Sequence, residues 1–480
     1  MGAVGTQSPV VGAASQLKTT QAKRPFTKDF KSLFAMLMIN LFSLRPDLQG
    51  KARYSFTSQE AIIRLQKLQF SRNASVPGST SNTITTTTYS MSELFATQMW
   101  EWYAEARFVE QLTAGGYFTS AKSTWQLTRK GIRVLSRFVL SNGVNEEAVT
   151  ELLQHERYML PLVILERDDK TDKIFTDRTT TELIFRRFAG ARPNTKDVSN
   201  KVSAASTDSN ILAGIPVTVT PRSPPANSLY QFNGHACLDW ILDNCMVTSE
   251  QEALAIANLF LRHGLISAEQ EKEDFELGTL SGFSARTSAI YRITDRGLDS
   301  TIWELSPRQS MDTSRGTHSR EAQSNSDKLL FILGDPALRL VFREFLDLRQ
   351  CEENLTFYYE VKEVMETWAS IKSAPEAQME TVIASVHSLY NAFLVDNAVS
   401  EVNLGSRLRK DLQASVCDLF QTPDEKATLL RATLDLFLAA QDSIFGLMAS
   451  DCVPLFLQQQ GNDRLYMDRS VQRGITLQAH

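Results

Sequence analysis

The chain has 480 residues, of which 42% are hydrophobic and 22% are charged, and its formal net charge is −5. These proportions are typical of folded globular proteins, and the length suffices for about three domains. The acidic balance argues against a general nucleic-acid-binding protein, which needs a basic surface. The five cysteines are odd in number and scattered without a CxxC pair, which argues against a disulfide framework and a standard zinc site.

Residues 1–25 are small and polar, and we expect them to form a disordered tail. No basic region followed by an apolar core opens the chain, so no secretory signal is predicted. The most apolar early run, residues 33–44, is interrupted by Asn40 and Ser43 and is shorter than the ~20 residues of a membrane span. Because the scattered cysteines also suit a reducing compartment, a cytoplasmic protein is predicted.

A first folded unit is expected over residues 26–142. Residues 29–44 are apolar on nearly all sides, which predicts a buried helix. The sequence Thr-Ser-Gln-Glu that begins at Thr57 has the pattern of a capping box and predicts the start of a second helix. Residues 92–112 carry large apolar side chains at helical spacing, which predicts a third, amphipathic helix.

Two further segments of this unit have a distinctive composition. Residues 72–90 are rich in Ser and Thr, and we expect them to form an inserted loop. Tyr117 and Phe118, followed by an aromatic and aliphatic run at 125–128, suggest a small β-hairpin after the third helix.

The middle of the chain is predicted to connect two folded units. Residues 143–190 are expected to be a bridging segment that contains a strand at 160–167 and a short helix at 181–188. Residues 191–227 are rich in Ser, Thr, Asn and Pro, which indicates a linker.

A second unit, residues 228–305, repeats the plan of the first. Apolar residues at 238–242 predict a short helix. Ser249, with Glu252 three residues later, has the capping pattern that opens a second, amphipathic helix. Residues 291–294 predict the returning strand of a hairpin.

The two units end on the same pattern, at 125–131 and at 291–297. Each pattern is an aromatic residue, a polar residue, an aliphatic residue, Thr, two polar residues and Gly. Helices followed by a hairpin make a winged-helix arrangement, and both units resemble DEP domains, the second more closely because the first has its long insertion. DNA binding by these units is not expected, because the helix at 249–262 carries Glu250 and Glu252 and only Arg262 as a base.

The last third of the chain is predicted to be all-α. Residues 306–325 form a polar linker by composition, residues 326–460 form the domain, and residues 461–480 form a tail. Helices are expected at 337–348, from 352 onward, at 376–395, at 406–419 and at 424–458, with a break near Asp451. The fold class is therefore multidomain and mainly α, with two α+β units followed by an all-α bundle.

Three blocks of the last domain resemble the RGS (regulator of G-protein signalling) domain. The first block is Phe-Arg-Glu-Phe-Leu at 342–346 with Glu-Glu-Asn-Leu-Thr-Phe at 352–357. The second is Tyr-Asn-Ala-Phe-Leu at 390–394 with Glu-Val-Asn-Leu at 401–404. The third is Ala-Gln-Asp-Ser-Ile-Phe-Gly-Leu-Met at 440–448 with Ser450 and Asp451. The blocks follow the family's order over residues 326–460. The order DEP, DEP, RGS resembles the fungal RGS proteins that desensitise pheromone and related receptor pathways.

The resemblance implies a GTPase-activating protein (GAP) for the α subunit of a heterotrimeric G protein (Gα), with no active site of its own. It places Asn403 toward the glutamine and the switch threonine of Gα. The other residues that it assigns to the Gα contact are Cys351, Glu353, Asn354, Leu404, Leu447, Asp451 and Cys452. No cofactor is implied, because GTP and Mg²⁺ belong to Gα. The DEP units imply targeting to a receptor tail, or peripheral contact with the inner face of the plasma membrane.

Three positions depart from the family pattern. Cys351 and Cys452 stand where Ser is usual, and Leu455 stands where many members have a basic residue that braces the acidic one. These departures leave a second hypothesis open, in which the domain is a non-catalytic scaffold that binds Gα or receptor tails. The intact Asn403 favours the GAP.

Overall fold

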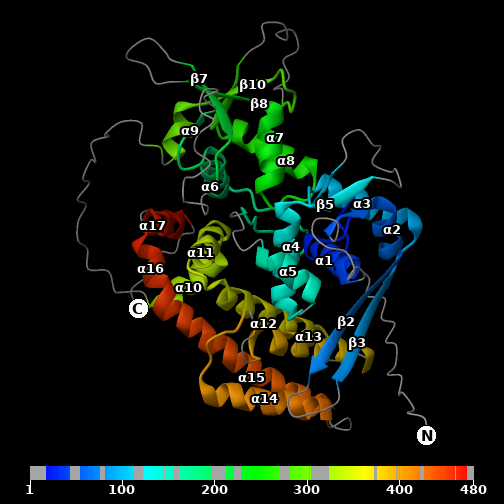
Figure 1. The fold of residues 1–480 in the computed structure, drawn as a ribbon. Helices are drawn as coiled ribbons and strands as arrows, with labels where there is room; N and C mark the ends of the chain where they lie inside the picture. Colours follow the sequence, from blue (N-terminus) through cyan, green and yellow to red (C-terminus); the bar gives the residue numbers. More distant parts are fainter. Residues whose placement is uncertain are drawn as a thin grey trace.

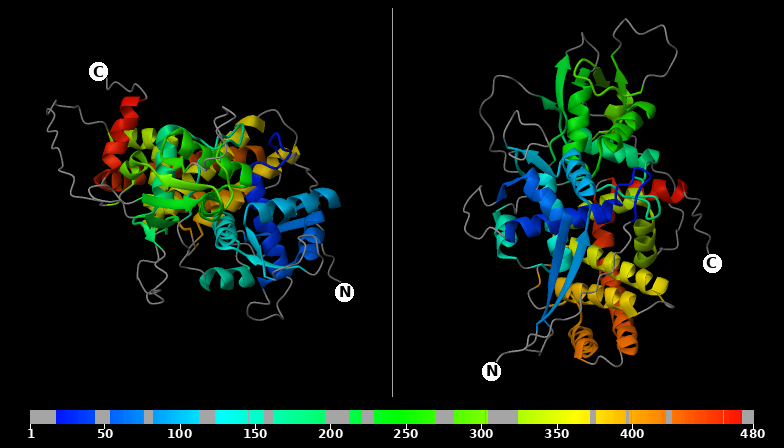
Figure 2. Two further views of the ribbon diagram at one scale, coloured as in Figure 1. Left: turned by 90° about the horizontal axis from the view of Figure 1, so that it is seen from above. Right: turned by 90° about the vertical axis from the view of Figure 1, so that its right-hand side faces the viewer.

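The computed structural model of the chain describes residues 18–43, 54–75, 82–112, 123–144, 146–155, 162–195, 212–220, 229–269, 282–301, 303, 324–371, 376–395, 398, 400–421, 426–459 and 461–472. These residues are mainly helical (Figure 1). The second α/β unit lies at the top of Figure 1 and the first at the right, and the C-terminal helices run from the left of the first unit to the bottom of the picture. The two further views show the same division of the molecule (Figure 2).

The first unit contains the predicted helices and a small sheet, but the third helix ends at Glu105 and does not reach residue 112, because residues 109–111 form a strand of the sheet. Its elements are α1 (Thr27–Ser43), β1 (Phe56–Thr57), α2 (Ser58–Gln66), α3 (Glu93–Glu105), β4 (Val109–Gln111), β5 (Thr124–Leu127) and α4 (Arg129–Asn142). The capping box is present, because the Thr57 side chain accepts from the Glu60 N–H and the Glu60 carboxylate accepts from the Thr57 N–H. The hairpin pairs β5 with β4, whereas Tyr117 and Phe118 lie outside the described residues.

The loop predicted at 72–90 is wrong for most of its length. Strands β2 (Lys67–Ser75) and β3 (Asn82–Ser90) pair antiparallel from Lys67 opposite Ser90 to Ser75 opposite Asn82. Figure 1 shows them as a long ribbon that extends away from α2 and α3. The polar composition indicates a loop, but the many threonines are β-branched and favour extended backbone, and this preference prevails.

The second unit follows the same order of elements. These are α6 (Arg178–Ala189), β8 (Leu229–Asn233), α7 (Gly234–Asn244), α8 (Glu250–Arg262), β9 (Ile266–Ala268), β10 (Ile290–Ile293) and α9 (Asp295–Ser300). The strand order β8-β10-β9 matches the order β1-β5-β4 of the first unit. The predicted linker at 191–227 supplies two more strands to this sheet, β6 (Asn194–Thr195) and β7 (Pro216–Thr220).

The repeated sequence pattern corresponds to a repeated corner. Thr128 accepts from the Gly131 N–H at 3.1 Å to cap α4, and Thr294 accepts from the Gly297 N–H at 3.0 Å to cap α9. A Cβ on Gly131 or Gly297 would lie 2.0 Å or 2.1 Å from a backbone oxygen just before the hairpin. The pattern therefore marks the place where a helix starts directly against the sheet.

The bridging segment differs from the prediction. The strand expected at 160–167 does not form in the described residues, where only Val163 and Arg167 make isolated bridges. An additional helix, α5 (Glu147–His155), follows α4, and the predicted short helix is α6. The end of the predicted N-terminal tail, residues 18–25, is also ordered against the second unit, because Arg24 pairs with Glu252 at 3.3 Å.

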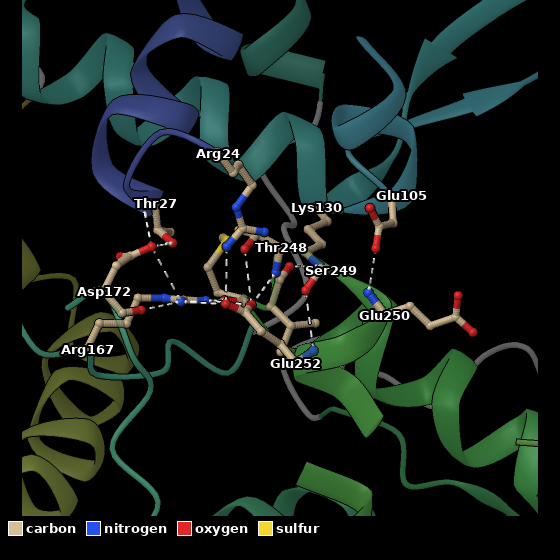
Figure 3. A network of polar contacts seen from close by, with 12 residues as sticks. Arg24, Thr27, Glu105, Lys130, Arg167, Asp172, Thr248, Ser249, Glu250 and Glu252 are labelled. Carbon is tan, nitrogen blue, oxygen red and sulfur yellow. Dashed lines mark hydrogen bonds and ion pairs between the residues drawn. The ribbon is translucent and has the colours of Figure 1, made fainter. Parts of the chain in front are cut away.

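A polar network joins the two α/β units (Figure 3). The Glu252 carboxylate accepts from Arg167 at 2.7 and 2.8 Å and from the Thr248 N–H at 2.7 Å. Burial alone would raise the pKa of Glu252, but the hydrogen bond and charge of Arg167, with smaller contributions from Thr248 and Arg24, lower it to about 2. Lys130 of α4 is buried and donates to two backbone carbonyls of the second unit, at 2.7 and 2.8 Å.

The C-terminal domain is a helical bundle. Its elements are α10 (Asn325–Gly334), α11 (Pro336–Leu348), α12 (Glu352–Ile371), α13 (Glu376–Phe393), α14 (Ser406–Gln421), α15 (Lys426–Leu447), the π-helical turn η3 (Met448–Cys452), α16 (Val453–Gln458) and α17 (Asn462–Gln472). The predicted break near Asp451 is the π-helical turn. The tail predicted at 461–480 is wrong in its first part, because α17 packs on α11 and α16. The buried residues of the bundle and of the second unit form one continuous core.

Within the described residues, the run from Lys426 to Gln458 is long and apolar enough to span a membrane by length and composition alone. In the bundle this run buries Leu430, Leu434, Phe437 and Ile444. Its apolar character is therefore accounted for by the core of the domain.

Candidate partner-binding surface of the helical bundle

The candidate site consists of three connections between helices: the α11–α12 corner, the stretch between α13 and α14, and the π-helical turn between α15 and α16. In the α11–α12 corner, only three residues separate Leu348 from Glu352, and the Cys351 N–H donates to the Leu346 carbonyl at 3.0 Å. Gln350 has a left-handed backbone with φ of 56°. Residues other than glycine seldom adopt this conformation, so the corner depends on support from its surroundings.

The first turn of α12 carries two predicted site residues, Glu353 and Asn354. Asn354 is only 5% exposed, and its amide donates to the Cys351 carbonyl at 3.3 Å and to Glu353 Oε1 at 3.0 Å. Burial raises the pKa of Glu353. Asn354 therefore lies inside the corner and orients Glu353, which is half-buried at its rim.

The π-helical turn packs against this corner through the two cysteines. The thiols of Cys351 and Cys452 interact, and this interaction is the main reason why the pKa of Cys351 is lowered and the pKa of Cys452 is raised. Cys452 is buried and Cys351 is half-buried. The structure thus brings together the two positions where the sequence departs from serine.

Asp451 is exposed on the same turn. Its Oδ1 accepts from the Ser450 hydroxyl at 2.7 Å. Leu455, where many RGS domains have a basic residue, is 38% exposed. Because a leucine cannot pair with the Asp451 carboxylate, the hydrogen bond from the Ser450 hydroxyl is the contact that orients it, from within the turn. Leu447 lies half-buried just before the turn.

Asn403 lies in a stretch without regular secondary structure between α13 and α14. Its neighbours Val402 and Leu404 are 1% and 6% exposed, whereas Asn403 itself is exposed. With both neighbours anchored in the core, the Asn403 amide is left at the surface. Leu404 supports this geometry from inside the domain.

Arg409 holds this stretch in place and was not predicted as a site residue. Its guanidinium donates to the carbonyls of Leu394 and Val402, both at 2.8 Å, and pairs with Glu401 at 3.0 Å. An arginine in the first turn of a helix is opposed by the helix dipole, which is the sequence signal that could have indicated a special role.

The three connections are linked through the core. The Val402 N–H donates to the Phe393 carbonyl at 3.0 Å, and the Phe393 ring contacts the Phe357 ring of α12 at 5.4 Å between centroids. The Gln441 side chain of α15 donates to the Tyr358 carbonyl of α12 at 2.7 Å. These contacts attach two elements to α12, which begins at the first corner. One is the stretch that bears Asn403, and the other is α15, which precedes the π-helical turn.

The surface offers amide and carboxylate groups rather than a set of metal ligands. In the part of the chain that the structure describes, no group of three or more His, Cys, Asp or Glu side chains could hold a metal ion. An open hollow of about 520 Å³ is lined by residues 405–408 and Asp411, at the start of α14. The chemistry available here is hydrogen bonding to a partner.

Comparison with known proteins agrees with this architecture. The model of the regulator of G protein signaling domain matches residues 328–465, and the model of the fungal-differentiation regulator winged helix domain matches residues 29–155. Developmental regulator flbA of Emericella nidulans is 36% identical over 477 residues, which are 95% of this chain and 66% of that protein. Regulator of G-protein signaling 1 of Schizosaccharomyces pombe is 26% identical over 456 residues, 93% of this chain and 91% of that protein.

The chain belongs to the fungal RGS proteins. A more distant relative, Regulator of G-protein signaling rgs-6 of Caenorhabditis elegans, is 26% identical over 151 residues, 31% of this chain and 18% of that protein. The RGS domain and a winged helix in the first unit are thus confirmed. The assignment of the two α/β units to the DEP family stays a prediction.

Proposed function

We propose that this RGS protein is a GAP for a heterotrimeric Gα and thereby reduces signalling from G-protein-coupled receptors. The observation that carries the proposal is the exposed Asn403 amide, held between two buried neighbours on the domain that matches the RGS family. The names of the two fungal relatives, a developmental regulator and a regulator of G-protein signaling, support the same pathway.

The proposed mechanism follows from what Gα lacks. Gα supplies its catalytic arginine in cis, so its partner need not provide one. The remaining cost is holding the mobile switch segments in the geometry of the transition state. A surface that binds this geometry more tightly than the ground state lowers the barrier, and each ~1.4 kcal/mol gives a tenfold faster reaction.

An asparagine suits this task, because its amide can donate to one partner group and accept from another. Asn403 is proposed to contact the glutamine and switch threonine of Gα, with Glu353 and Asp451 holding the flanking switch segments. Asn354 and Leu404 are buried and support them from inside. GTP and Mg²⁺ remain in Gα, and the chain is proposed to use no cofactor and no active site of its own.

The other predicted partners are also part of this proposal. The α/β units are proposed to bring the RGS domain from the cytoplasm to a receptor tail at the inner face of the plasma membrane. The alternative, a scaffold that binds Gα without accelerating hydrolysis, is favoured by Cys351, Cys452 and Leu455. The Ser450 hydroxyl on Asp451 weakens that alternative, because it orients the carboxylate without the missing basic residue.

Single-turnover GTP hydrolysis by a purified inhibitory-type Gα tests the proposal. The full-length chain should accelerate hydrolysis, and Asn403→Ala should reduce the acceleration by at least about tenfold, or ~1.4 kcal/mol. Gln413→Ala, which removes an exposed amide from α14 away from the three connections, is the matched control and should be fully active. Hydrolysis at the intrinsic rate with several Gα types would leave the scaffold as the remaining function.

A further inference from the structure

Helix α4 of the first unit packs behind the α11–α12 corner of the RGS domain. Arg133 Nη2 lies 2.8 Å from Asp347 Oδ1 and 3.6 Å from Glu352 Oε2. Arg137 forms a second ion pair with Glu352. Arg343 of α11 approaches the same carboxylate at 3.8 Å. Three arginines therefore meet one glutamate at the point where α12 begins.

These pairs are largely removed from solvent. The side chains of Arg133 and Glu352 are each 17% exposed, and that of Arg137 is 28% exposed. Ion pairs with this burial are screened less by water and salt than surface pairs. Burial alone would raise the pKa of Glu352, but the charges of Arg137, Arg343 and Arg133 lower it, so the glutamate stays ionised.

The position of the contacts relates them to the candidate site. Asp347 lies in the last turn of α11 and Glu352 is the first residue of α12, so Arg133 bridges the two sides of the corner. Between them lies the left-handed Gln350, a conformation that needs outside support. Glu353, a proposed Gα contact, directly follows Glu352.

Contacts of the same region continue onto α13. The Ser388 hydroxyl donates to the Asn142 side chain at 3.4 Å, at the end of α4. A Cβ on Gly143, the left-handed residue after α4, would lie 3.1 Å from the backbone of Asn391. Helix α13 ends at Phe393, whose carbonyl holds Val402 beside Asn403. The first unit therefore supports two of the three connections.

We propose that Arg133 and Arg137 are positioning residues for the Gα-contact corner, so that the first unit is part of the GAP machinery as well as a targeting module. This inference rests on the proposed function. It implies that an RGS fragment without the first unit has a less ordered corner and is a weaker activator.

The test uses the full-length double variant Arg133→Gln/Arg137→Gln and two measurements. Hydrogen exchange should become at least about tenfold faster for the amides of residues 349–356 and stay unchanged in the buried part of α15. GAP activity in single turnover should fall about tenfold at low concentrations of the chain and recover as the concentration rises, because the defect lies in binding Gα. Arg133→Lys/Arg137→Lys keeps both charges and should recover part of the loss.

Arg129→Gln is the matched control, because Arg129 is exposed in the first turn of the same helix. The proposal is overturned if exchange at residues 349–356 in the double variant equals that of Arg129→Gln. It is also overturned if exchange rises but GAP activity is unchanged, since the corner would then not need this support. If the unmodified chain fails to activate Gα, the proposed function fails, and exchange alone decides whether the arginines hold the corner.

Discussion

Replacing Arg469 with methionine is expected to lower the free energy of unfolding by about 3–5 kcal/mol, because it leaves a buried carboxylate without its cation. Arg469 of α17 donates to Asp335 Oδ2 at 2.9 and 2.7 Å and to Asp177 Oδ1 at 3.2 Å. Asp335 is fully buried and caps α11, accepting two backbone N–H groups at 3.0 Å. Asp177 caps α6. One arginine therefore connects the first turns of helices in two domains.

The measurement is urea unfolding of the full-length chain, followed by circular dichroism and by tryptophan fluorescence. Arg464→Met is the control, because Arg464 is exposed on the same helix. Equal unfolding midpoints for the two variants would contradict the role of Arg469. The same reasoning predicts that a fragment ending at residue 460, the boundary expected from sequence, is destabilised because it lacks α17.

Replacing Glu252 with glutamine is expected to destabilise the chain by about 3 kcal/mol at neutral pH. The folded pKa of about 2 lies below the usual 4.5, a difference that corresponds to roughly this free energy. Since the folded pKa is depressed, the stabilisation is fully present above pH 4.5 and is lost as the pH falls toward 2. The stability difference between the two proteins should therefore be constant from pH 5 to 7 and shrink below pH 4.5.

Chemical unfolding at pH 7, 5, 4 and 3 measures this difference. Glu250→Gln is the matched control, because Glu250 is exposed in the same first turn of α8. A Glu252→Gln variant as stable as Glu250→Gln at pH 7, or a difference that grows on acidification, would exclude the network as a stabilising contact. The network joins α8 to Arg167 and Arg24, so its loss should also loosen the junction of the two units.

The parts of the fold that follow from local signals could be predicted from the sequence. The capping box at Thr57, the Ser249 cap and the helices predicted between residues 337 and 458 of the RGS domain appear where the pattern places them, whereas α10 and α17 were not predicted. In each case the residues that interact lie within a turn or two of one another. The order of the RGS blocks then predicted the bundle and, with it, the family.

The features that were missed depend on interactions distant in sequence or on competing preferences. The β2–β3 ribbon has loop composition, and the β-branched residues that favour extended backbone occur only in β3. Strands β6 and β7 form because they extend a sheet whose other strands come later in the chain. The pairs of Arg133 with Asp347 and of Arg469 with Asp335 join residues more than a hundred positions apart, which leaves no periodic signal.

In the candidate site, too, some features could be predicted from the sequence and others depend on the packing of the folded domain. The sequence predicted Asn403, Glu353 and Asp451 as contact residues, and in the structure they lie at the three linked connections of one domain. It could not indicate that Asn354 and Leu404 are buried supports, because burial depends on the packing of the whole bundle. The unusual position of Arg409 in the first turn of α14 is visible in the sequence, but its partners, the backbone carbonyls of Leu394 and Val402, are not.

Preferential binding of the transition state is checked by the affinity of the full-length chain for Gα in three states. These states are Gα bound to GDP, to a non-hydrolysable GTP analogue, and to GDP with aluminium fluoride as a transition-state mimic. We expect binding at least about tenfold tighter to the transition-state mimic than to the GTP-analogue state, and loss of this preference in Asn403→Ala. Equal affinity of the unmodified chain for these two states would contradict this expectation, because uniform binding cannot accelerate hydrolysis.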